Sequence, residues 1–143
     1  MNTLEEYTGG CHCGALRIIF STRLNPAELP LRACQCSFCR KHGARSVSDP
    51  EGLVSLKLVE PEQVNRYRFG LQTADFYLCN RCGVYVGAVS RSDPGTAIAI
   101  VNALDDRAAF TMPAEPAIFD QETADERRAR RVRDWTPARV ETR

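Results

Sequence analysis

The sequence predicts a mainly β protein in which antiparallel strands form most of the fold and a short helix lies near the C terminus. Apolar and polar residues alternate in several short segments, as they do in strands with one buried face. No long helical pattern lies between these segments to provide the crossovers that parallel strands need. Seven cysteines in three tight groups add a further constraint, because such groups are typical of metal sites that join distant parts of a sheet.

Six segments are predicted to be strands. Three of them alternate clearly between apolar and polar residues, and the other three are bounded by turn-forming residues such as Gly70 and the Asp93-Pro94-Gly95 sequence. In chain order, the predicted strands are residues 16–20, 54–58, 64–69, 74–78, 84–88 and 96–103.

Helix is expected in two places. Residues 37–42 are long enough for a short turn, and residues 122–133 have a sustained helix-forming composition with five arginines and few apolar anchors. We interpret residues 121–143 as an arginine-rich tail or solvated surface helix held in place by Trp135. The alternative is an anion-binding or nucleic-acid role for the arginines, but no aromatic residues alternate with them to stack on bases.

Length and charge limit the classes of function. A chain of 143 residues fits one domain, so we predict a single zinc-binding domain over residues 1–143. The net charge of +1 provides no overall field that would attract nucleic acid or an anionic membrane. No segment approaches the ~20 apolar residues that span a bilayer, and the acidic N terminus does not resemble a secretory signal. We therefore expect a cytoplasmic protein with no membrane or nucleic-acid partner.

The cysteines are the main functional signal. In a reducing cytoplasm, clustered cysteines more often bind metal or carry out redox chemistry than form disulfides. An odd number also leaves one thiol unpaired in any scheme made only of disulfides. The three groups are Cys11 and Cys13, then Cys34, Cys36 and Cys39, then Cys79 and Cys82.

The residues that follow each group predict which cysteines share a metal. Gly14 and Gly83 each follow a pair, where a positive φ lets the chain turn and backbone amides approach the sulfurs. The middle group is followed by Arg40 instead. We therefore predict that the two outer pairs share one closed structural zinc site with the ligands Cys11, Cys13, Cys79 and Cys82.

The remaining cysteines, Cys34, Cys36 and Cys39, are predicted to hold a second zinc ion with an open fourth position, which is typical of a catalytic site. Three thiolates make the ion a weak activator of water, so a thiol substrate suits it better. Bound as thiolate, its sulfur would lie beside an electrophile such as an aldehyde carbonyl. The ligand type favours zinc over iron.

Two histidines and several alternatives bear on this hypothesis. His42 lies three residues after Cys39, so it is either a fourth ligand that closes the second site or an acid that protonates a developing alkoxide. His12 lies between two predicted ligands and is expected to point away from the metal. A further alternative makes all seven cysteines buried small residues or redox thiols.

The ordered motifs resemble the glutathione-dependent formaldehyde-activating enzyme family, also called the centromere-protein-V-like family. The resemblance covers nearly the whole chain up to about Phe119. It is carried by Gly10-Cys11-His12-Cys13-Gly14-Ala15-Leu16, Cys34-Gln35-Cys36-Ser37-Phe38-Cys39-Arg40-Lys41, Gly43-Ala44, Cys79-Asn80-Arg81-Cys82-Gly83 and Leu104-Asp105-Asp106.

This resemblance implies an Mss4-like, β-tent fold with the same division of cysteines between a structural and a second zinc ion. It also implies a carbon–sulfur lyase activity that forms or cleaves an adduct between a thiol, glutathione, and formaldehyde. Related β-tent proteins bind protein partners, so the alternative function is a non-catalytic zinc module.

The chain departs from the family pattern at two positions. Val84 replaces a common serine, and Ala117 replaces the histidine of a His-Ile-Phe sequence. Near the second group, Arg40, Lys41 and Arg45 are candidates for anion contact or simply solvated charges.

Overall fold

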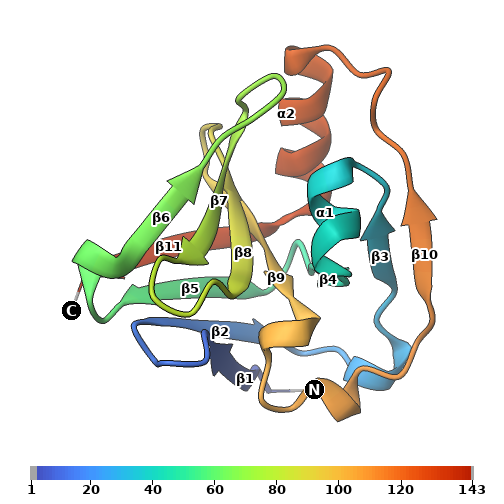
Figure 1. Ribbon diagram of the computed structural model, residues 1–143. Coiled ribbons are helices and arrows are strands. Elements are labelled where there is room, and N and C mark those ends of the chain that lie inside the picture. The colour runs from blue at the N-terminus through green and yellow to red at the C-terminus, as the bar shows by residue number, and fades with distance from the viewer. Residues whose placement is uncertain (1–2, 143) are drawn as a thin grey trace.

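The computed structural model describes residues 3–142, in which backbone pairing connects eleven strands (Figure 1). The strands are β1 (Glu5–Gly10), β2 (Leu16–Thr22), β3 (Leu31–Cys34), β4 (Ser46–Val47), β5 (Leu53–Leu58), β6 (Val64–Tyr67), β7 (Ala74–Cys79), β8 (Tyr85–Ser90), β9 (Thr96–Ile100), β10 (Ala114–Ala117) and β11 (Thr136–Thr142). The helices are α1 (Ser37–His42) and α2 (Ala124–Asp134), with short 3-10 turns at Pro26–Glu28, Pro61–Gln63, Val101–Ala103 and Arg107–Ala109.

The fold is mainly β, as the sequence predicts. One path of neighbouring strands runs β1-β2-β5-β11-β9-β4-β3-β10, and β8 also pairs with β9 and leads through β7 to β6. Most pairs are antiparallel. Two pairs are parallel, β10 with β3 and β11 with β5, and in both a late segment of the chain returns to an early strand.

All six predicted strands are present, as β2, β5, β6, β7, β8 and β9. The last of these is shorter than predicted, because the chain turns into a 3-10 helix at Val101–Ala103. Five strands were not predicted, namely β1, β3, β4, β10 and β11.

The apolar core has two parts. The larger part contains the fully buried inward-facing residues of β2 and β5, such as Phe20 and Leu56, and full burial of one such side chain contributes about 1.5–3 kcal/mol. The smaller part packs Cys39 of α1 against Phe76, Tyr85 and neighbouring residues. This second part fixes the position of the middle cysteine group.

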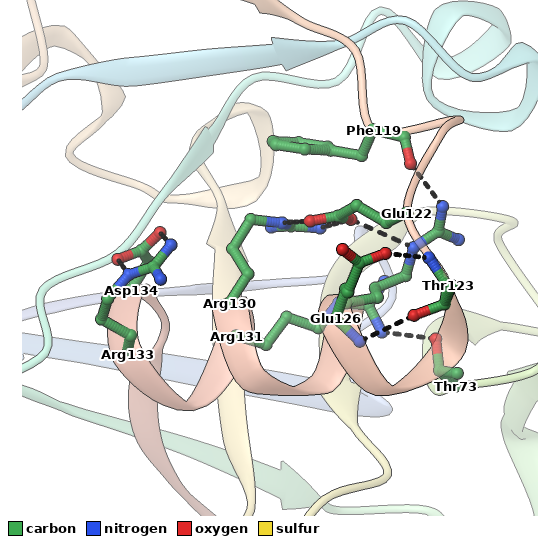
Figure 2. Close-up of polar contacts among 10 residues, drawn as sticks. Thr73, Phe119, Glu122, Thr123, Glu126, Arg130, Arg131, Arg133 and Asp134 are labelled. Atoms are coloured by element: carbon green, nitrogen blue, oxygen red, sulfur yellow. Dashed lines mark hydrogen bonds and ion pairs between the residues drawn. The ribbon is translucent and has the colours of Figure 1, made fainter.

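Both predicted helices form. α2 begins at a capping box, in which Thr123 Oγ1 accepts from the Glu126 amide at 3.1 Å and Glu126 Oε1 accepts from the Thr123 amide at 2.9 Å (Figure 2). It ends next to Trp135, which is buried as expected of an anchor. Within residues 3–142, neither helix has the length and apolar character needed to cross a membrane.

Candidate metal sites and pocket

The two outer cysteine pairs meet in space. The sulfur atoms of Cys11, Cys13, Cys79 and Cys82 all lie within 4.8 Å of one another. Cys13 Sγ is 3.8 Å from Cys11 Sγ and 3.5 Å from Cys79 Sγ. A tetrahedral zinc ion with Zn–S bonds of about 2.3 Å needs sulfurs about 3.8 Å apart. The donor set therefore fits one metal ion with four sulfur ligands.

The local backbone explains why these sulfurs converge. Gly14 and Gly83 adopt φ values of +86° and +78°, so the turn after each cysteine pair uses the left-handed region that glycine tolerates best. The sulfurs also accept backbone hydrogen bonds, from the Leu16 amide to Cys11 at 3.3 Å and from the Arg81 amide to Cys79 at 3.3 Å. Such bonds stabilise the thiolate form that a metal requires.

The middle group forms a second cluster. Cys34 ends β3, Cys36 is the N-cap of α1, and Cys39 lies in that helix, with their sulfurs within 4.8 Å of one another. Cys36 Sγ accepts from the Cys39 amide at 3.4 Å. Within residues 3–142, no fourth histidine, cysteine or carboxylate atom joins the three sulfurs at this distance. The structure thus separates the seven cysteines into groups of four and three, the division that the sequence predicts.

A hydrogen bond links the thiols of Cys34 and Cys39 in the second cluster. A hydrogen bond from the Cys39 thiol lowers the pKa of Cys34 to about 5, against an opposing desolvation effect. The same interaction, together with burial, raises the pKa of the Cys39 thiol. Cys39 therefore keeps its proton in the metal-free cluster and must lose it when a cation binds, so metal binding here releases protons.

The histidines lie outside both clusters. The ring of His42 is exposed and packs against Phe38 at a centroid distance of 4.6 Å and Tyr85 at 5.5 Å. Neither of its ring nitrogens joins the second cluster, so its roles as fourth ligand or acid remain predictions. His12 is exposed, as expected for a side chain between two ligands.

A pocket of about 570 Å³ opens beside the second cluster and is lined by Cys34, Cys36 and Cys39. This volume is in the range of small-molecule sites. Its apolar walls come from β7, β9 and the residue after α2, namely Phe76, Ile98 and Trp135. None of the four cysteines of the first cluster lines it. Of the two clusters, the cluster of three is therefore the one that lines this pocket.

Arginines form the polar wall of this pocket. Arg127, Arg130 and Arg131 of α2 line it together with Arg32 of β3. The prediction of a solvated surface helix is wrong for these three residues of α2, because Arg131 is 6% exposed and the other two are half-buried. Their i, i+3, i+4 spacing places them on one helix face, and this was the signal in the sequence that could have revealed them.

The candidates next to the second cysteine group lie elsewhere. Arg40 and Lys41 are exposed, Arg45 is half-buried, and none of the three lines the pocket. Of the two interpretations, solvated charge therefore fits Arg40 and Lys41 better than contact with an anion in this pocket.

Glu122 neutralises part of the arginine wall. Arg130 Nε donates to Glu122 Oε2 at 2.7 Å and its second nitrogen to Oε1 at 3.0 Å, while Arg127 Nε lies 3.4 Å from Oε1. The guanidinium of Arg130 also lies 3.6 Å from the centre of the Phe119 ring (Figure 2). These contacts, first of all the hydrogen bond from Arg130, lower the pKa of Glu122.

We expect Glu122→Gln to lower the free energy of unfolding at pH 7 by about 1–2 kcal/mol, because charge-assisted hydrogen bonds are lost. The pKa of Glu122 is lower in the folded protein, so its contribution is present above the unfolded pKa of about 4.3 and is lost as pH falls. The loss is complete only below the folded pKa, so urea unfolding at pH 7 and pH 3 should show a smaller difference between the variant and wild type at the lower pH.

The matched control is Asp125→Asn in the same helix. The Asp125 side chain is fully exposed, and its ion pair with Arg128 is long at 3.5 Å. It should leave the urea midpoint nearly unchanged at both pH values. A difference between Glu122→Gln and wild type that does not vary with pH would assign the loss to packing instead of charge.

Comparison with known proteins identifies the relatives of this chain. Residues 6–122 match the sequence profile of the glutathione-dependent formaldehyde-activating enzyme family. The chain belongs to this family. The crystal structure of a Rhodobacter sphaeroides protein is also similar, with 27% sequence identity, a TM-score of 0.54, and an alignment that covers 77% of this chain and 99% of that one. In this member of the formaldehyde-activating family, both cysteine clusters lie inside the matched region, whereas α2 lies beyond it.

Proposed function

We propose that the protein is a zinc-dependent carbon–sulfur lyase that forms or cleaves the adduct between a glutathione-like thiol and an aldehyde such as formaldehyde. Family membership supports glutathione-related aldehyde activation. The observation that carries the specific proposal is the second cluster, where three sulfurs face a pocket and no fourth side-chain ligand joins them in the described chain.

The donor chemistry of both clusters fits zinc. Thiolates are favoured ligands of this ion, four suit a structural site, and three leave one position for substrate. We assign Cys11, Cys13, Cys79 and Cys82 to the structural ion and Cys34, Cys36 and Cys39 to the second. When bound by the second cluster, zinc would lower the pKa of the substrate thiol, so the substrate sulfur would be held as a thiolate.

The chain itself positions the reactants. The pocket beside Cys34, Cys36 and Cys39 holds a thiol near an aldehyde, and its apolar walls at Phe76, Ile98 and Trp135 exclude water. A bond forms between the sulfur and the carbonyl carbon. The π electrons of the carbonyl pass to its oxygen, which takes up the proton released by the thiol, and the product is the S-hydroxymethyl thioether. Cleavage is the reverse of the same steps.

The rest of the proposal concerns the whole chain. We take residues 1–143 as one zinc-binding domain in a cytoplasmic protein whose partners are the small thiol and aldehyde.

The alternative function, a non-catalytic zinc module, would need a side chain such as His42 as the fourth ligand of the second metal. X-ray absorption separates the two possibilities, because imidazole nitrogen at the metal favours the module and an exchangeable light ligand favours the enzyme.

The test is the rate of adduct exchange at equilibrium, since spontaneous adduct formation masks catalysis in an endpoint assay. Two-dimensional exchange NMR with glutathione and ¹³C-formaldehyde should show exchange at least about tenfold faster with protein carrying two zinc ions than without it. Protein that carries two zinc ions and leaves the exchange rate unchanged would contradict the proposed function.

A further inference from the structure

We infer that α2 provides an anion-binding subsite centred on Arg131, which receives a carboxylate of the thiol substrate. This inference rests on the proposed function and adds to it the residue that would bind a carboxylate of the substrate. Arg131 lies beyond residue 122, where the family match ends, so the subsite would be a property of this chain's own C-terminal segment.

Arg131 is a buried cation without an acidic partner. Its side chain donates to Thr73 Oγ1 at 2.7 Å, and its guanidinium lies 4.6 Å from the centre of the Trp135 ring (Figure 2 shows the contact with Thr73). Its Nε is buried and has no hydrogen-bond partner. Within residues 3–142, no carboxylate lies within 4.0 Å of it.

The neighbouring charges do not compensate for Arg131. The carboxylate of Glu122 is already shared by Arg127 and Arg130. Arg32 of β3 donates to Ser48 Oγ at 2.5 Å and has no ion pair among the described residues. Among the arginine and carboxylate side chains of the pocket lining, four arginines face two acids, namely Arg32, Arg127, Arg130, Arg131, Asp120 and Glu122. These side chains alone leave an excess of two positive charges, which the thiolates of the second cluster offset in part.

Physical chemistry favours an anion in this position. A buried charge without a partner is costly, and a carboxylate that makes charge-assisted hydrogen bonds with a guanidinium removes much of that cost. Burial and the charges of Arg130 and Arg127 lower the pKa of Arg131 to about 10, so the side chain remains a cation at neutral pH. An incoming anion would also reduce the repulsion among these three arginines.

The subsite and the second cluster belong to one pocket. Cys34, Cys36 and Cys39 line it together with Arg131, and apolar side chains such as Phe76 and Ile98 line the same space. A substrate with a thiol, a short carbon chain and a carboxylate matches these three kinds of surface. A neutral thiol would leave Arg131 without an acidic partner.

A purely structural role for Arg131 makes a different prediction. The thiolates of the second cluster are negatively charged, and Cys34 interacts electrostatically with Arg131. If Arg131 served only to balance this charge, its replacement would change the affinity for every thiol by the same factor. The test therefore compares thiols that differ in charge.

The experiment uses protein carrying two zinc ions and follows the fluorescence of Trp135, the only tryptophan, which lines the pocket. Wild type should bind 3-mercaptopropionate at least about tenfold more tightly than neutral 2-mercaptoethanol. Arg131→Gln should lower the affinity for 3-mercaptopropionate by about tenfold to hundredfold and change that for 2-mercaptoethanol by less than about twofold. The control Arg133→Gln removes a 70% exposed arginine of the same helix and should change neither affinity.

Equal losses for both thiols, or no preference in wild type, would overturn the subsite. The wild-type comparison needs no variant, so the absence of a preference would overturn the subsite even if Arg131→Gln fails to fold. Failure of the proposed function gives a different result. A preference for 3-mercaptopropionate without faster adduct exchange would support the subsite and contradict the enzyme, whereas faster exchange without a preference would do the reverse.

Discussion

Cys79→Ser is expected to remove one metal ion from the protein and to lower the free energy of unfolding by about 4 kcal/mol or more, the contribution of a ligand present at about a thousand times its Kd. The reason is topological. Cys11 and Cys13 lie in the turn between β1 and β2, and Cys79 lies at the end of β7, 66 residues after Cys13. The first cluster therefore joins two distant hairpins, and the metal binds only when the fold holds them together.

Native mass spectrometry and urea unfolding measure the two effects. The metal content should fall from two ions to one, and the urea midpoint should fall with it. Treating wild type with a strong chelator should lower the midpoint further still, because both ions are then removed. A Cys79→Ser protein that keeps both ions and the wild-type midpoint would show that this cluster is not a structural metal site.

Much of the site could be predicted because its information is local. Each cysteine group is short, and Gly14 and Gly83 mark the turns by the positive φ that their positions require. The division into four and three sulfurs therefore followed from the order of residues along the chain, before any contact was known. The same holds for the strands that alternate, such as β2 and β5, whose pattern reports one buried face.

The missed strands depend on contacts that are distant in sequence. β11 begins with Thr136 and Pro137 and alternates apolar and polar residues only over residues 138–141, which is too short a signal to predict a strand. It nevertheless pairs in parallel with β5, where Val140 lies opposite Leu56. β1 is acidic and ends in two glycines. Gly9 is required there because a Cβ atom at that position would lie 2.2 Å from the carbonyl oxygen of Ala103. Neither the pairing of β11 with β5 nor the close approach of Gly9 to Ala103 can be seen without the tertiary fold.

The arginines of α2 show a related difficulty. Composition alone treats a run of charges as a solvated face, and this holds for Arg133, which is 70% exposed. It fails for Arg130 and Arg131, which line a pocket whose other walls come from distant parts of the chain. The spacing could identify the shared face of the helix, but the partner of that face, the second cysteine cluster, lies about 90 residues earlier.

The second large effect is expected from Cys36→Ser, which should remove the other metal ion and lower the rate of adduct exchange by about 100-fold or more, or about 2.7 kcal/mol of transition-state stabilisation. With Cys36 gone, only Cys34 and Cys39 remain to hold a metal beside the pocket. The helix should nevertheless form, because Cys36 is its N-cap and serine is among the best residues at that position. The introduced hydroxyl can accept from the Cys39 amide as the sulfur does.

This retained cap separates the loss of activity from a loss of fold. Far-ultraviolet circular dichroism should be unchanged, and the urea midpoint should fall less than in Cys79→Ser, because the first cluster still joins the two hairpins. Ser37→Ala, one residue along the same helix at an exposed position, should keep both ions and full exchange. If Cys36→Ser binds one ion yet exchanges the adduct at the wild-type rate, the reaction does not depend on the second cluster, and the pocket beside it is not the active site.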